Sequence, residues 1–142
     1  MRRDALRADA YGGLSFGPGA RPILSHTGIT AHCPSPRNLP DETLVRIARS
    51  GGLIGVGFWE DVVCGARPDD IAQAIAAAIE LVGEDHVSLG SDWDGSVDAP
   101  FDAAHLWALT QALLDRGLTT DRIAKIMGGN MMAYLARTLP EG

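Results

Sequence analysis

The chain has 142 residues, 46% of them hydrophobic and 21% charged, which is typical of a folded globular domain rather than a disordered segment. Its formal charge of -6, with no run of Lys or Arg, argues against nucleic-acid binding, because phosphate recognition needs a basic face. The apolar stretch at 71–82 is shorter than the ~20 residues of a membrane span, and Arg2 and Arg3 precede no apolar segment of a signal peptide. We therefore expect a soluble, cytoplasmic chain without membrane contact.

Residues 1–21 have the weakest pattern: residues 4–10 are compatible with a short helix, and a glycine-rich loop follows. From residue 22 onward, short apolar runs typical of buried strands alternate with helical periodicity. The predicted strands are 22–26, 53–58 and 86–90, and the predicted helices are 40–50, 68–82, 102–116, 120–127 and 131–138.

Alternation of strands and helices implies parallel strands joined by right-handed crossovers. Three such units fit either part of a (β/α)8 barrel or a small doubly wound sheet. A complete barrel needs about 250 residues, so a chain of 142 residues is too short to close one.

Chemically capable residues follow the predicted strands, at the sheet edge where α/β folds bind ligands. His26 ends the first strand, and its imidazole could bind zinc, act as an acid or base, or simply form hydrogen bonds at the rim of the core. Asp92 follows the third strand, where it could accept a proton or bind a substrate amine, although Asp-x-Asp-Gly is also ordinary turn chemistry. Arg37, in a proline-rich loop, could clamp a substrate carboxylate or be a solvated surface residue.

The tryptophans and nearby acids are less specific. Trp59, Trp93 and Trp107 could line a pocket, although for Trp107 packing on its helix face is the favoured interpretation. Glu60 and Asp61 diverge in direction and are expected to be loop charges.

Cysteine usage and nucleotide motifs add little. Cys33 and Cys64 could be buried thiols, a disulfide or metal ligands, and their spacing gives only a weak zinc signal. No phosphate-binding glycine motif follows a strand, and no GxSxG nucleophile elbow occurs.

Taken together, several segments resemble the membrane (renal) dipeptidase family, zinc metallopeptidases with a (β/α)8 barrel and a binuclear zinc site. They occur in the order and approximate spacing of that family, from residue 22 to the end of the chain. The segments are PILSHT (22–27), CPSPRNL (33–39), GGLIGV (51–56), LVGEDHV (81–87), LGSDWDG (89–95) and IMGGN (126–130). The resemblance implies a partial barrel, about the C-terminal three β/α units plus terminal helices, over residues 22–142, preceded by a poorly matched segment at 1–21.

The resemblance also implies roles for individual residues. His26 matches a histidine that binds one of the two zinc ions, and Arg37 matches the arginine that holds the carboxylate of a dipeptide substrate. Asp92 matches an aspartate that assists proton transfer after a zinc-bridging hydroxide attacks the peptide carbonyl. Cys33 and Cys64 fall near a pair that is disulfide-bonded in some relatives, with an offset of one residue at Cys64.

The remaining zinc ligands of the family have no counterpart here. They are a His-x-Asp pair on the first strand, a bridging glutamate and a second histidine, which would lie near Ala5. One ligand cannot form a usual three- or four-ligand zinc site, so we expect a truncated dipeptidase without full activity. The alternatives are a related metal-dependent amidohydrolase and a non-catalytic interaction module, which could form homo-oligomers through exposed sheet edges.

Overall fold

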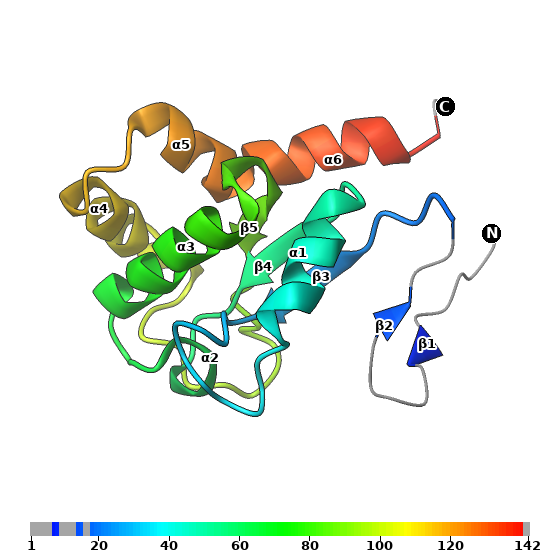
Figure 1. Cartoon of the computed structure of the whole chain (residues 1–142). Coiled ribbons are helices and arrows are strands. Elements are labelled where there is room, and N and C mark those ends of the chain that lie inside the picture. Colours follow the sequence, from blue (N-terminus) through cyan, green and yellow to red (C-terminus); the bar gives the residue numbers. More distant parts are fainter. Residues whose placement is uncertain (1–6, 9–13, 16–17, 141–142) are drawn as a thin grey trace.

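The computed structural model describes residues 7–8, 14–15 and 18–140. Its centre is a three-stranded parallel sheet in the order β3 (Ile23–Thr27), β4 (Leu53–Val56) and β5 (Val87–Leu89). Helices connect the strands (Figure 1). The predicted α/β class with a parallel sheet is confirmed.

Two helices pack against the sheet and contribute to the core. They are α1 (Asp41–Arg49) and α3 (Pro68–Val82), whose predicted positions are confirmed. α1 begins directly after Pro40 and α3 begins at Pro68, and both have acids in the first turn, which complement the helix dipole. Their apolar faces bury Leu44, Ile47, Ile71 and Ile75 against Ile54 and Val56 of β4.

The strand β3 differs from its sequence prediction. Its apolar run predicts a buried strand, but exposed and partly buried residues alternate along it, and Ile23 is 40% exposed. Within the described residues β3 has one neighbour, β4, so its outer edge and part of one face remain accessible.

The N-terminal prediction is partly testable. Arg7–Ala8 (β1) pairs with Leu14–Ser15 (β2) as antiparallel strands, so the helix predicted over residues 4–10 is wrong at Arg7–Ala8. The rest of that range lies outside the described residues. The division between residues 1–21 and 22–142 stays a prediction.

After β5 the chain forms α4 (Trp107–Asp115), α5 (Thr120–Ala124) and α6 (Asn130–Thr138). A 3-10 turn at Ala103–His105 precedes α4, and the segment Lys125–Gly129, which is kinked at Gly128 (φ 155°), joins α5 to α6. The side chain of Asn130 donates to the carbonyl oxygens of Glu84 and Val87, at 2.6 and 2.8 Å, which fixes α6 against the start of β5.

The predicted packing of Trp107 is wrong. This side chain is 66% exposed, because α4 turns Leu109, Ala112 and Leu113 toward the core and Trp107 lies outside that apolar face. Among the described residues, no helix is long and apolar enough to cross a bilayer.

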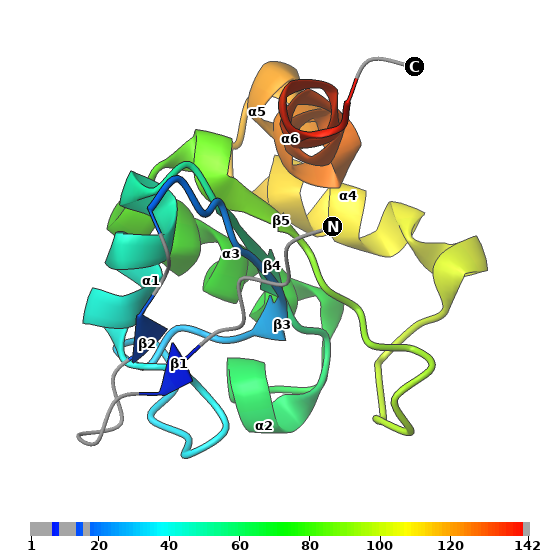
Figure 2. The same cartoon turned by 90° about the vertical axis from the view of Figure 1, so that its right-hand side faces the viewer.

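The four-residue helix α2 (Glu60–Val63) occupies the segment predicted to be a loop after β4. Both views place α2 and α6 at opposite ends of the molecule (Figures 1 and 2). The carboxyl ends of the strands therefore face the α2 end, where the predicted site residues gather.

Candidate functional site

A β-bulge at the end of β3 positions His26. Leu24 pairs with Ile54 and Thr27 with Val56, so β3 has one more residue than β4 between these two pairs. The bulge brings the carbonyl oxygen of Ser25 so close to Gly55 and Gly90 that a Cβ on either glycine would lie only 2.1 or 2.2 Å from it. Only glycine fits at these two positions, and the strand then places Thr27 in the core and His26 at the rim.

The bulge brings His26 and Asp92 together. His26 Nε2 lies 3.8 Å from Asp92 Oδ2, and the two side chains are 32% and 17% exposed. This separation is longer than a hydrogen bond, so His26 Nε2 and Asp92 Oδ2 are both left to bind another partner. His26 Nδ1 lies 2.9 Å from Ser25 Oγ. When Nδ1–H donates to this hydroxyl, the neutral ring presents a lone pair on Nε2.

Asp92 occupies a constrained turn after β5. Its backbone is left-handed, with φ 56°, a conformation that aspartate tolerates better than most residues. Its carbonyl oxygen accepts from Gly95 N–H at 2.8 Å. A Cβ on Gly95 would lie 2.5 Å from the Asp92 carboxylate, so this glycine leaves room for the acid. The turn chemistry expected for this segment is therefore present, and it leaves the carboxylate of Asp92 beside the cavity.

Arg37 is carried by a loop that a buried asparagine holds in place. Asn38 Oδ1 accepts from Gly28 N–H at 2.8 Å, and its Nδ2 donates to the carbonyl oxygens of Cys33 and Val62 at 2.9 and 3.0 Å. Asn38 is only 8% exposed. The sequence gives no local signal for this role, because one of its partners is 24 residues away.

A disulfide between Cys33 and Cys64 provides a second tie between this loop and α2. Among the alternatives that the sequence leaves open, the structure therefore has the disulfide. The bridge and Asn38 both connect the loop of Arg37 to the segment that follows Trp59.

Trp59 contacts two of the three predicted residues, Arg37 and His26. The guanidinium carbon of Arg37 lies 5.7 Å from the centre of the Trp59 ring, within the range of a cation–π contact. The ring of His26 lies 5.8 Å from the ring of Trp59, centre to centre. Trp59 itself is 6% exposed, so it is a fixed platform between the two side chains.

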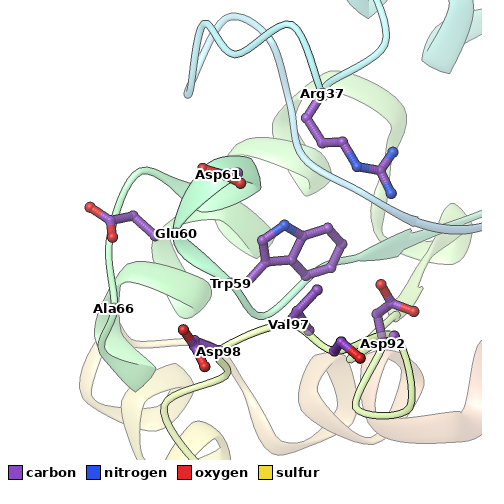
Figure 3. Close-up of a pocket in the computed structure, with 10 residues that line it drawn as sticks. Arg37, Trp59, Glu60, Asp61, Ala66, Asp92, Val97 and Asp98 are labelled. Carbon is purple, nitrogen blue, oxygen red and sulfur yellow. The ribbon is translucent and has the colours of Figure 1, made fainter.

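A cavity of about 500 Å³ lies over this platform. Arg37, Trp59 and Asp92 line it, and Figure 3 shows Arg37 and Asp92 approaching the indole from two sides. Glu60, Asp61 and Asp98 also line the cavity. Glu60 and Asp61 begin the helix α2, whereas the sequence predicts that they are charges in a loop. His26 does not line it but contacts two residues that do, Trp59 and Asp92.

The donor set of the described residues does not by itself fit a bound metal. No group of three or more His, Cys, Asp or Glu side chains that could hold an ion occurs within them. His26 and Asp92 are two neighbouring donors, whereas a catalytic zinc usually has three protein ligands. The groups that line the cavity include one guanidinium, from Arg37, and the carboxylate of Asp92.

The sequence model of the membrane dipeptidase family (peptidase family M19) matches residues 19–138. The chain belongs to this family. It is 38% identical over 121 residues to Dipeptidase ataJ of Aspergillus terreus, covering 80% of this chain and 30% of that protein. The chain thus spans about a third of the length of this relative.

Solved structures agree. A metallo peptidase from Rhodobacter sphaeroides, liganded with a phosphinate mimic of L-Ala-D-Ala, is 29% identical with a TM-score of 0.77, covering 84% of this chain and 37% of that one. An amidohydrolase from Pseudomonas aeruginosa is 26% identical with a TM-score of 0.69, covering 80% of this chain and 44% of that one. Membership in a metallodipeptidase family implies a metal cofactor and a dipeptide substrate for the family.

Proposed function

We propose that this chain forms the substrate-carboxylate and proton-transfer part of a zinc-dependent dipeptidase active site. The observation that carries the proposal is the placement of Arg37 and Asp92 around one cavity, with Trp59 between them and His26 beside Asp92. The carboxyl ends of parallel strands are where barrel enzymes place their catalytic groups.

Arg37 is the residue that would recognise a dipeptide by its free carboxylate. Its planar guanidinium can donate two parallel hydrogen bonds to one carboxylate. The contact with Trp59 restricts where the guanidinium lies, so less conformational freedom is lost when the substrate binds.

Asp92 would take up and deliver the proton that peptide hydrolysis moves to the leaving amine. Its side chain is 17% exposed and faces the cavity, so it is accessible to a substrate but partly shielded from water. His26 would contribute one ligand to the metal that the family uses, and the missing ligands would come from the barrel units that this chain does not contain. Zinc supplies Lewis-acid chemistry when such a site is complete.

The proposed architecture is a partial (β/α)8 barrel, here about its C-terminal three units and terminal helices. In support, the chain aligns with 37% of the Rhodobacter sphaeroides peptidase at a TM-score of 0.77. We also propose a cytoplasmic location. Disulfides are more common in oxidising compartments, so the Cys33–Cys64 bridge argues against this location.

The proposal is tested with a chimera in which residues 19–138 replace the matching part of the Rhodobacter sphaeroides peptidase. Hydrolysis of L-Ala-D-Ala and of its C-terminal amide is measured with zinc. The unaltered chimera should prefer the free dipeptide strongly, and Arg37→Gln should remove most of this preference. The exposed Arg46 gives a matched control, because Arg46→Gln removes the same charge away from the cavity. A folded chimera with no hydrolysis, or an unchanged preference in Arg37→Gln, contradicts the proposal.

Two other functions have specific support. The similarity to an amidohydrolase favours hydrolysis of other amides, and N-acyl amino acids assayed beside free dipeptides separate the two activities. The unpaired outer edge of β3 within the described residues favours an interaction module or a homo-oligomer. Light scattering of the isolated chain measures its molecular mass. A mass that rises with concentration would support this second function.

A further inference from the structure

A second cavity lies at the opposite edge of the sheet, where the strands begin. Its volume is about 490 Å³, and it is lined by Arg21, Arg49, Arg137, His86, Ser50 and Asp85, together with Gly51. The cavity shares no residue with the one over Trp59. It has the size of a small-molecule site.

Four separate segments bring the basic side chains together. Arg21 precedes β3, Arg49 ends α1, His86 precedes β5 and Arg137 lies in the last turn of α6. These residues are far apart in the sequence, so their convergence is a property of the fold.

The backbone around the cavity is fixed by specific contacts. Gly51 has φ +81°, and the place of its absent Cβ is 3.6 Å from Arg21 Cδ, so the aliphatic part of Arg21 packs over this turn. Tyr134 donates its hydroxyl hydrogen to the carbonyl oxygen of Arg21. His86 Nδ1 lies 3.0 Å from the carbonyl oxygen of Gly52, an acceptor, so Nδ1 carries the hydrogen and Nε2 is left for another partner.

The arginines lack carboxylate partners within the described part of the chain. The ion pairs found there include none with Arg21, Arg49 or Arg137. Asp85 is the acid in the lining, and its carboxylate already accepts from Lys125 Nζ at 2.8 Å. The positive charge is gathered here in a chain whose formal charge is -6.

Helix dipoles account for part of this arrangement. Arg49 and Arg137 lie in the last turns of their helices, where a cation is favourable. Arg21 is on no helix, and the dipoles do not require all three guanidinium groups to line one cavity. The three guanidinium groups repel one another. A multivalent anion bound between them would attract all three and so offset this repulsion.

The number of arginines indicates the chemistry of the ligand. One carboxylate has two oxygens, which a single guanidinium fork satisfies. Three forks need more acceptor oxygens and more than one negative charge, as a phosphate group provides. We propose that this cavity is an anion site for a phosphate-bearing small molecule.

Isothermal titration calorimetry of the full 142-residue chain with pyrophosphate tests the proposal, at constant ionic strength so that screening is equal in every sample. Saturable binding is expected, and Arg49→Gln or Arg137→Gln should each weaken it at least about tenfold, since a charge-assisted hydrogen bond is lost. The control Arg46→Gln removes the same charge from the same helix, away from the cavity, and should leave the affinity unchanged. Arg37→Gln, at the other cavity, should also have no effect.

Succinate in place of pyrophosphate distinguishes a phosphate site from a general carboxylate site. It should bind more weakly by at least about tenfold, because it offers fewer oxygens and less charge at one point. The absence of saturable pyrophosphate binding in the unaltered chain overturns the proposal. Equal weakening by Arg49→Gln and Arg46→Gln also overturns it, because the attraction would then be non-specific, as does succinate binding as tight as that of pyrophosphate. Circular dichroism of each variant identifies any loss of fold, and a variant that unfolds is replaced by the corresponding Arg→Lys change.

Discussion

Replacing Asn38 with alanine should destabilise the chain through the loop that carries Arg37. The side chain is 8% exposed and makes three hydrogen bonds to backbone groups of Gly28, Cys33 and Val62. Each bond contributes about 1 kcal/mol, and a buried backbone group left without a partner costs roughly 1–3 kcal/mol. Because the smaller alanine leaves room for water or a small backbone shift to satisfy some of these groups, we expect a loss of about 2–4 kcal/mol in the free energy of unfolding.

Urea unfolding followed by tryptophan fluorescence measures this loss. With a slope of about 2 kcal/mol per molar urea, the midpoint should fall by roughly 1–2 M. Gln111→Ala is the matched control, since Gln111 is an exposed amide bonded only to Asp115 at 2.7 Å, and it should change stability by less than about 0.5 kcal/mol. If Asn38→Ala and Gln111→Ala have the same midpoint, the buried amide does not hold the loop.

Asn38→Asp refines the test without changing the size of the side chain. The new carboxylate keeps an acceptor for Gly28 N–H but turns an oxygen toward the carbonyl oxygens of Cys33 and Val62. Repulsion and burial should raise its folded-state pKa above the unfolded value. The folded state then binds the proton more tightly, so the variant should gain stability as the pH falls toward the unfolded pKa and lose it as the pH rises.

Three further predictions concern other parts of the chain. Replacing Cys33 and Cys64 together by alanine removes a bridge with a sequence separation of 31. The free energy of unfolding, measured with urea, should fall by about 3–4 kcal/mol, mostly because the unfolded chain gains conformational freedom. An unchanged midpoint would mean that the bridge does not form in solution. Hydrogen bonds from Arg67 lower the pKa of Asp70 from its ordinary value. This pair therefore stabilises the fold above about pH 4, and the contribution is lost as the pH falls through the lowered pKa. The stability of Arg67→Gln should depend less on pH in that window, and an acid-unfolding curve identical to that of the unaltered chain would contradict this role of the pair. Trp107→Gln should leave stability within about 0.5 kcal/mol, because the side chain is 66% exposed, and a loss of several kcal/mol would show that it is buried.

Local sequence signals were sufficient for the main helices. Proline and acids mark the starts of α1 and α3, and Gly51 and Gly83 follow their ends with positive φ angles of 81° and 88°. These signals act within a few residues, so they can be recognised without knowledge of the fold. Trp107 shows the limit: its helix was predicted, but the face that meets the core depends on the neighbours of α4.

The bulge in β3 could not be predicted, because it depends on Gly55 in β4 and on Gly90 directly after β5. Its extra residue requires that Gly55 and Gly90 lack a Cβ beside the carbonyl oxygen of Ser25. The sequence of β3 alone contains no sign of this. The predicted position of His26 at the strand end was useful because strand ends meet at one edge of a parallel sheet, whatever the local irregularity.

The candidate site was partly accessible to sequence reasoning. His26, Arg37 and Asp92 were singled out by their places after strands and by the family resemblance, and the structure brings them around Trp59. Their chemical roles stay predictions. The support from Asn38 was not visible in the sequence, because whether an asparagine in a loop is buried depends on contacts with a distant segment.

The most direct test of the account is the rate of dipeptide hydrolysis by the chimera with zinc, compared between Asp92→Asn and Asp94→Asn. Asp94 is an exposed acid two residues away that does not line the cavity, so it controls for the charge of the turn. Asp92→Asn should lower kcat by at least about a hundredfold, the scale of a lost acid–base group, while Asp94→Asn should retain nearly full activity. Equal rates in the two variants would show that Asp92 does not transfer the proton and would contradict the assignment of this cavity as a dipeptidase site.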